Sequence, residues 1–71
     1  MDKSLSYKVG QRIKEIRTEK NISQQDLASK CNFEKSNMSR IEAGRTDPKL
    51  TTLERICKGL DVDITELFKF S

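Results

Sequence analysis

The stretch SQQDLASKCNFEKSNMSRIEAG, residues 23–44, decides the fold, because two short helical patterns stand only a few residues apart in it. In each half, apolar residues recur at the spacing of one helix face. This predicts one helix over residues 24–30 and a second over residues 35–43. Asn32 can turn the chain between them because it tolerates the left-handed backbone conformation, and Gly44 is the usual residue at a helix end. The stretch therefore predicts a helix, a turn of roughly three to four residues, and a second helix.

The starts of three predicted helices share a pattern that fixes the angle at which a chain enters a helix. In each, one apolar residue precedes the cap position and another follows in the first turns, where the two can pack together. The three pairs are Ile22 with Leu27, Phe33 with Met38, and Val62 with Leu67. At the first start, Ser23 and Asp26 also resemble a capping box. The pattern favours several short helices at set angles over one long helix.

Three further helices are predicted, over residues 7–20, 50–60 and 64–68, with an Asp47–Pro48 turn before the second of them. The cap of the 50–60 helix is ambiguous, because Lys49 is a poor cap and Thr51 with Glu54 forms an alternative capping box. Its predicted apolar face comprises Leu50, Leu53, Ile56, Cys57 and Leu60. The predicted fold is all-α: one compact five-helix domain over residues 1–71, without room for a second domain.

Charge is distributed unevenly along the chain, although the net charge of +3 is unremarkable by itself. Residues 1–20 hold six Lys and Arg against three Asp and Glu, and residues 30–58 hold seven against four. Residues 59–71 reverse the balance, with one against three. A polyanionic partner would therefore meet the first two segments. No apolar run approaches the ~20 residues of a membrane span, and no signal-peptide core follows the start, so a cytoplasmic protein is expected.

Catalysis and metal binding find little support in the residues. The chain has no histidine, no glycine-rich phosphate loop and no nucleophile beside a base, so an enzyme is not expected. Cys31 and Cys57 occupy apolar positions and form no CxxC pair, which predicts buried side chains rather than zinc ligands or a disulfide. No metal, cofactor, small-molecule ligand or membrane partner is expected.

The outer face of the 35–43 helix is predicted to carry side chains of the types that can read DNA bases. Lysine and arginine donate to guanine O6 and N7, asparagine pairs with adenine, and serine serves several bases. The residues of these types are Lys35, Ser36, Asn37 and Arg40. Polarity alone favours a solvated helix face with no partner.

The sequence resembles the Cro/C1-type helix-turn-helix family, the phage-repressor-like (XRE) regulators, over residues 9–68. The resemblance rests on RIKEIRTEKNISQQDLASKCNF, residues 12–33, and on SNMSRIEAGRTDPKLTTLERICKGLDVDITELF, residues 36–68. It implies a lambda-repressor-like fold with the helix-turn-helix at about residues 24–43. It also implies binding of double-stranded DNA, usually as a homodimer.

The resemblance also implies roles for individual residues. Base reading falls to Lys35, Ser36, Asn37 and Arg40. Contacts to the DNA backbone fall to Gln24, Ser39, Arg45, Thr46 and Lys49. Arg17 and Glu42 are expected to form a structural ion pair between two helices. The carboxyl-terminal aromatic residues, Phe68 and Phe70, are assigned to a two-fold interface formed by the last two helices.

Two positions depart from the family pattern. Asn32 stands where the family often has glycine, and Glu34 opens the recognition helix where serine or threonine is usual. A carboxylate suits a helix amino terminus, but this one would face DNA. There it could accept a hydrogen bond from the N4 amine of cytosine, or otherwise repel phosphate.

The leading hypothesis is a sequence-specific transcriptional regulator whose recognition helix reads an operator half-site in the major groove, as a homodimer on an inverted repeat. A restriction–modification controller protein and an antitoxin-type autoregulator are alternatives within this class. A protein–protein interaction module without specific DNA binding is an alternative of another class. The basic, hydrogen-bonding outer face of the 35–43 helix argues against that last alternative.

Overall fold

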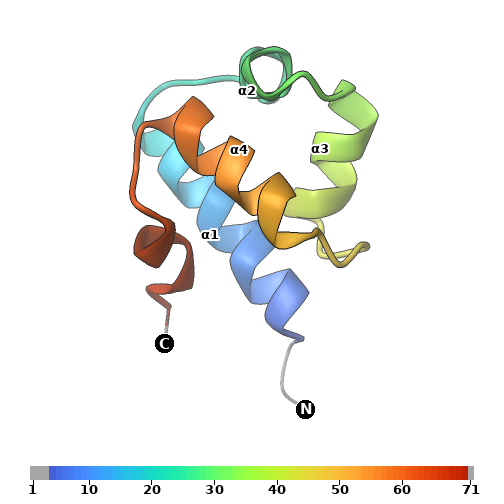
Figure 1. Cartoon of the computed structure of the whole chain (residues 1–71), viewed down its shortest axis with the longest axis vertical. Helices are drawn as coiled ribbons and strands as arrows, with labels where there is room; N and C mark the ends of the chain where they lie inside the picture. The colour runs from blue at the N-terminus through green and yellow to red at the C-terminus, as the bar shows by residue number, and fades with distance from the viewer. Residues whose placement is uncertain (1–3, 71) are drawn as a thin grey trace.

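The structure, a computed structural model, describes residues 4–70. Four α-helices and one short 3-10 helix follow one another, and no strand occurs in this part of the chain. The elements are α1 (Leu5–Glu19), α2 (Gln24–Cys31), α3 (Lys35–Glu42), α4 (Leu50–Leu60) and η1 (Ile64–Phe68) (Figure 1). The domain prediction and the charge count also included residues 1–3 and 71, which lie outside the described residues.

The prediction of five α-helices is wrong in its last member, because η1 is a 3-10 helix. Its backbone closes i to i+3 hydrogen bonds, as when the amide of Glu66 donates to the carbonyl of Asp63 at 3.0 Å. An α-helix of five residues would close too few hydrogen bonds to offset the cost of ordering its first turn. A single tight turn is therefore sufficient to bring Leu67 into the core.

The predicted helix starts are largely confirmed. The hydroxyl of Ser23 accepts a hydrogen bond from the amide of Asp26 at 3.0 Å. The apolar residues that precede the three starts are partly buried and pack against the core, which contains their predicted partners; they are Ile22, Phe33 and Val62. Lys49 occupies the cap position of α4 without a side-chain hydrogen bond, which resolves the ambiguity at this start.

The turns use left-handed backbone conformations at three residues with short polar side chains. The φ angles are 59° at Asn21, 60° at Asn32 and 58° at Asp61, each at the end of a helix. After Asn32 the amide of Phe33 donates to the carbonyl of Ala28 at 2.8 Å, which closes the end of α2. Asparagine thus performs here the turn that glycine performs in the family pattern.

The core draws on all five elements. α1 packs against α3 and η1, and α2 packs against α3 and α4 (Figure 1). Burying each large apolar side chain contributes about 1.5–3 kcal/mol relative to leaving it exposed. The largest fully buried side chains are Ile13, Leu27, Met38, Ile56, Leu60 and Leu67.

Two residues of the predicted apolar face of α4 show how far that pattern holds. Cys57 is buried and free, like Cys31, and burial raises the pKa of both thiols. Leu50 is 79% exposed, so the predicted apolar face is not buried at its first residue. It is the first residue of α4 and lies on the apolar stripe, but beyond the edge of the core.

None of the helices in residues 4–70 has the length and apolar character needed to span a membrane.

A cluster of charges holds η1 against α1. Arg12 donates from Nε to the carbonyl of Glu66 at 2.8 Å and from Nη2 to its carboxylate at 3.3 Å. Lys69 donates to the same carboxylate at 2.6 Å. The Lys69 hydrogen bond is the largest of several effects that hold the pKa of Glu66 below its ordinary value.

Candidate nucleic-acid interface

α3 presents its polar residues outward, as the sequence predicts. Met38, Ile41 and Glu42 are buried, and they fix the inner face of the helix. The four predicted base readers are all exposed, three in the first turn and Arg40 one turn later. Arg40 donates a hydrogen bond of 3.5 Å to the side-chain oxygen of Asn37, so these two predicted readers also contact each other.

A buried ion pair fixes α3 to α1, as predicted from the resemblance. Arg17 donates from Nε and Nη2 to the two carboxylate oxygens of Glu42, at 2.7 and 3.1 Å. The two residues are 8% and 3% exposed. Arg17 also donates from Nη1 to the carbonyl of Ile22 at 2.8 Å, which ties in the segment before α2.

Gln24 joins this ion pair, a contact that the sequence did not predict. Its side-chain nitrogen donates to the carboxylate oxygen Oε1 of Glu42 at 3.0 Å. Gln24 was predicted to contact DNA phosphate, and in the structure its side chain contacts a carboxylate 18 positions away. Spacing could not reveal this contact, because it depends on how the start of α2 packs on the end of α3.

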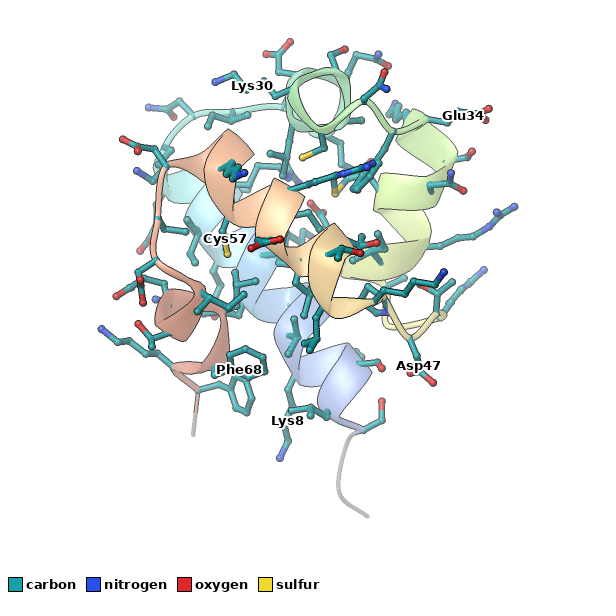
Figure 2. The ribbon with its side chains drawn as sticks, viewed as in Figure 1. Lys8, Lys30, Glu34, Asp47, Cys57 and Phe68 are labelled. Atoms are coloured by element: carbon teal, nitrogen blue, oxygen red, sulfur yellow. The ribbon has the colours of Figure 1, made fainter. Side chains whose placement is uncertain are left out.

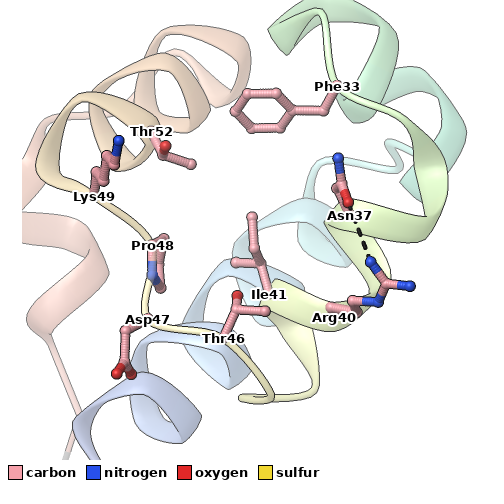
Figure 3. Close-up of a pocket in the computed structure, with 9 residues that line it drawn as sticks. All are labelled: Phe33, Asn37, Arg40, Ile41, Thr46, Asp47, Pro48, Lys49 and Thr52. Atoms are coloured by element: carbon pink, nitrogen blue, oxygen red, sulfur yellow. Dashed lines mark hydrogen bonds between the residues drawn. The ribbon is translucent and has the colours of Figure 1, made fainter.

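A hollow lies beside α3 on the side that faces the loop before α4 (Figure 3). We call it the loop-side hollow; its volume is about 360 Å³. Its apolar lining comes from Phe33, Ile41 and Pro48. Its polar lining comes from Asn37, Arg40, Thr46, Asp47, Lys49 and Thr52.

The loop-side hollow brings together residues predicted for two different roles. Asn37 and Arg40 were predicted base readers, whereas Thr46 and Lys49 were predicted to contact the DNA backbone. Thr52 was not predicted, because it lies inside α4, where the residue spacing indicates only an apolar face. Arg45 is exposed in the same loop but does not line the hollow.

The loop before α4 is held by the start of α1. Gly44 has a φ of 74°, and a Cβ there would lie 2.9 Å from Cβ of Tyr7, so glycine is required for both conformation and space. The hydroxyl of Ser6 donates a hydrogen bond to the carboxylate of Asp47. The amide of Arg45 donates to the carbonyl of Arg40 at 3.0 Å, which continues the end of α3 into the loop.

Glu34 stands at the cap position of α3 but makes no side-chain cap hydrogen bond. Figure 2 shows its side chain projecting from the start of the helix. The carboxylate is exposed and therefore remains available to a partner.

The predicted dimer residues lie away from this face, at the end of the chain. Phe68 and Phe70 are 41% and 37% exposed, with ring centroids 6.5 Å apart. The ammonium of Lys8 lies 5.8 Å from the centroid of the Phe70 ring. Figure 2 shows Phe68 and Lys8 together at the end of the molecule farthest from Lys30.

A comparison with protein families agrees with this arrangement. A family model described as Helix-turn-helix matches residues 13–67. The chain belongs to the helix-turn-helix family. The matched residues include α2, α3 and the turn between them, and they cover most of the described chain.

Two relatives of this helix-turn-helix protein differ in how much of their own length matches it. The immunity repressor protein of Bacillus phage phi105 is 41% identical over 59 residues, which cover 83% of this chain and 41% of the repressor. Control protein C.BamHI of Bacillus amyloliquefaciens is 33% identical over 72 residues, covering 100% of this chain and 89% of the control protein. The chain thus spans about two fifths of the phage repressor and most of the control protein.

Among solved structures, the restriction–modification controller protein C.AhdI from Aeromonas hydrophila superposes on this helix-turn-helix protein with a TM-score of 0.86. Its sequence is 33% identical, and the match covers 89% of this chain and 96% of the controller protein. The Cro/C1-type resemblance noted in the sequence is thereby confirmed at the level of the family.

Proposed function

We propose that this protein is a sequence-specific, double-stranded DNA-binding transcriptional regulator. The observation that carries the proposal is the construction of α3: an outward row of hydrogen-bonding side chains on a helix that a buried ion pair fixes to its scaffold. A solvated surface helix needs no such anchor, whereas a helix that reads bases must be held in one orientation.

In this proposal α3 lies in the major groove with its first turn deepest. Lys35 and Arg40 donate to guanine, Asn37 pairs with adenine, and Ser36 serves either kind of base. Each good bidentate contact discriminates against a wrong base by about 1–3 kcal/mol.

Contacts to the DNA backbone set the position of α3 without reading sequence. Arg45, Thr46 and Lys49 make them from the loop before α4. Gln24 and Ser39 make them from the opposite side of α3.

We assign the homodimer interface to α4 and η1, with Phe68 and Phe70 as its aromatic residues. Partly exposed apolar side chains on this part of the molecule support the assignment, and Leu50 and Ile64, at 79% and 38% exposed, add to it. A two-fold dimer presents two copies of α3 about 34 Å apart, one turn of DNA, and so reads an inverted repeat.

Within this class, a restriction–modification controller protein is favoured. The likeness to C.BamHI and to the C.AhdI structure supports it. C.AhdI is named a restriction–modification controller protein, C.BamHI is named a control protein, and both match along most of their length. A stand-alone repressor and an antitoxin-type autoregulator are the remaining alternatives.

Selection from a random pool of duplex DNA at two salt concentrations, followed by sequencing, tests the proposal. The expected result is enrichment of an inverted repeat whose half-sites lie one turn apart. Salt-sensitive binding that enriches no sequence would contradict it, since the basic surface would then act only as a general electrostatic attractor. That outcome would favour a protein–protein interaction module.

A further inference from the structure

The apolar part of the loop-side hollow has no role among the DNA contacts assigned so far. Phe33, Ile41 and Pro48 supply it. Ile41 is buried, but Phe33 and Pro48 are only half-buried, so part of their apolar surface still meets water. Figure 3 shows the Phe33 ring extending from the start of α3 toward α4, across one end of the hollow. A hydrophobic surface is therefore open at this end.

The open end of the hollow lies beside the predicted base readers. Phe33 directly precedes Glu34, the cap residue of α3, so its ring stands next to the first turn of that helix. In the proposed function this turn lies deepest in the major groove. Asn37 and Arg40 line the same hollow from α3. A duplex read by these two residues would therefore cover the Phe33 end of the hollow with the edges of its bases.

The charges around the hollow also suit a duplex. Arg40 and Lys49 both line it and carry positive charge. Asp47 lines it as well, but its carboxylate accepts a hydrogen bond from the hydroxyl of Ser6. Figure 3 shows that carboxylate pointing away from Phe33. The Phe33 end is thus apolar and free of negative charge from Asp47, beside a cationic rim.

The chemistry of the major groove decides which group of DNA fits this apolar surface. The base edges there present hydrogen-bond donors, acceptors and one apolar group, the C5 methyl of thymine. A donor or acceptor pressed against Phe33 would lose its water without gaining a hydrogen bond, which is unfavourable. A methyl group loses nothing in this way, and contact with phenylalanine is one of the ways in which proteins recognise it.

We propose that the loop-side hollow receives the C5 methyl group of a thymine in each half-site, with Phe33 as the residue that recognises it. This inference rests on the proposed function, and it adds a specificity-determining residue that precedes α3 and lies outside the four predicted base readers. The thymine lies next to the base pairs that Asn37 and Arg40 read. Cytosine lacks the methyl group and is disfavoured at this position.

Replacing thymine by deoxyuridine tests the contact, because it removes the methyl group and keeps every hydrogen-bonding group of the base. Each thymine of the selected site is replaced singly, and binding is measured by competition against the unmodified duplex. One replacement per half-site should weaken binding about fourfold, the factor expected for withdrawing one buried carbon. Replacements outside the selected site are the control and should have no effect.

A variant of the protein locates the contact. Phe33→Leu shortens the side chain, so it should remove most of the loss that deoxyuridine causes at the sensitive position. The matched control is Ile22→Val, because Ile22 is also partly buried before a helix start and packs against the same core, but does not line the hollow. This control should keep the full loss. Thermal unfolding checks that both variants are folded in the assay, and Phe33→Met replaces Phe33→Leu if the latter is not.

The outcomes separate this inference from the proposed function. A selected site without thymine in its half-sites, or one that accepts deoxyuridine throughout without loss of affinity, would refute the methyl contact while the proposed function stands. An equal loss in the Phe33 variant and the wild type would place the contact elsewhere and overturn the assignment to Phe33. If the wild type selects no sequence, the proposed function itself fails.

Discussion

Replacing Glu42 by alanine should lower the free energy of unfolding by about 3–5 kcal/mol, because the change leaves the buried Arg17 guanidinium without its counter-ion. Glu42 is 3% exposed, and its carboxylate accepts three hydrogen bonds, two from Arg17 and one from Gln24. Of the hydrogen-bond partners of the Arg17 guanidinium, only the carbonyl of Ile22 would remain. For a domain of this size each kcal/mol shifts the unfolding midpoint by about 4–8 °C, so the midpoint should fall by roughly 12 °C or more.

Thermal and urea unfolding followed by circular dichroism measure this effect. The matched control is Glu15→Ala, which removes an exposed ion pair with Arg12 and should cost no more than about 1 kcal/mol. The double variant Arg17→Met/Glu42→Leu should be more stable than Glu42→Ala, because it removes both charges together. Equal stabilities of Glu42→Ala and Glu15→Ala would refute the reasoning that burial makes this pair indispensable.

Three further predictions follow from the packing, the charges and the exposed aromatic rings. Gly10→Ala should lower the free energy of unfolding by about 1–3 kcal/mol in urea, because a Cβ there overlaps backbone carbonyls at the end of α3. Unchanged or raised stability would show that α3 can shift to accept the Cβ at little cost. Since the pKa of Glu66 is lowered in the folded state, its contribution is present above the ordinary carboxyl pKa of about 4.3 and is lost as the pH falls through the folded value. Glu66→Gln should therefore flatten the fall of the unfolding midpoint with acid, and an unaltered pH profile would contradict this. The double variant Phe68→Ser/Phe70→Ser should keep its circular dichroism spectrum but sediment as a monomer. A persistent dimer would show that neither ring is needed for the interface.

Features set by a few neighbouring residues were predictable from the sequence. Ser23, Asn32 and Gly44 act through their own backbone or the next turn, so local rules are sufficient to place them. The apolar pairs at the helix starts are equally local, and the structure packs all three against the core. The base-reading and phosphate assignments remain predictions, although the structure exposes the four readers on one helix.

Features that depend on where an element ends, or on contacts far apart in sequence, were not predictable. Periodicity placed Leu50 on the apolar stripe, but it cannot show that the core stops before the first turn of α4. It likewise predicts a short helix after Val62 without distinguishing α from 3-10 geometry. The contact between Gln24 and Glu42 forms only when the start of α2 packs on the end of α3. From the sequence alone, the Gln24 amide could donate equally well to a phosphate or to a carboxylate.

The two hollows beside α3 illustrate the same limit. Thr52 from α4 lines the loop-side hollow, and Lys14 from α1 lines a second hollow, between α1 and α3. Both residues lie outside the helix-turn-helix itself, which was predicted at about residues 24–43. Their contribution emerges only when the packing of the whole domain is known.

The central claim is that α3 reads base sequence, and competition binding against every single base-pair variant of the selected half-site tests it most directly. The wild type and Lys35→Ala are compared on the same set of duplexes, with Lys30→Ala as the control. The account predicts that Lys35→Ala loses discrimination at one base pair, by about 1–3 kcal/mol, and keeps the wild-type preference elsewhere. The same preference at every base pair in Lys35→Ala and the wild type would contradict the assignment of Lys35 as a base reader.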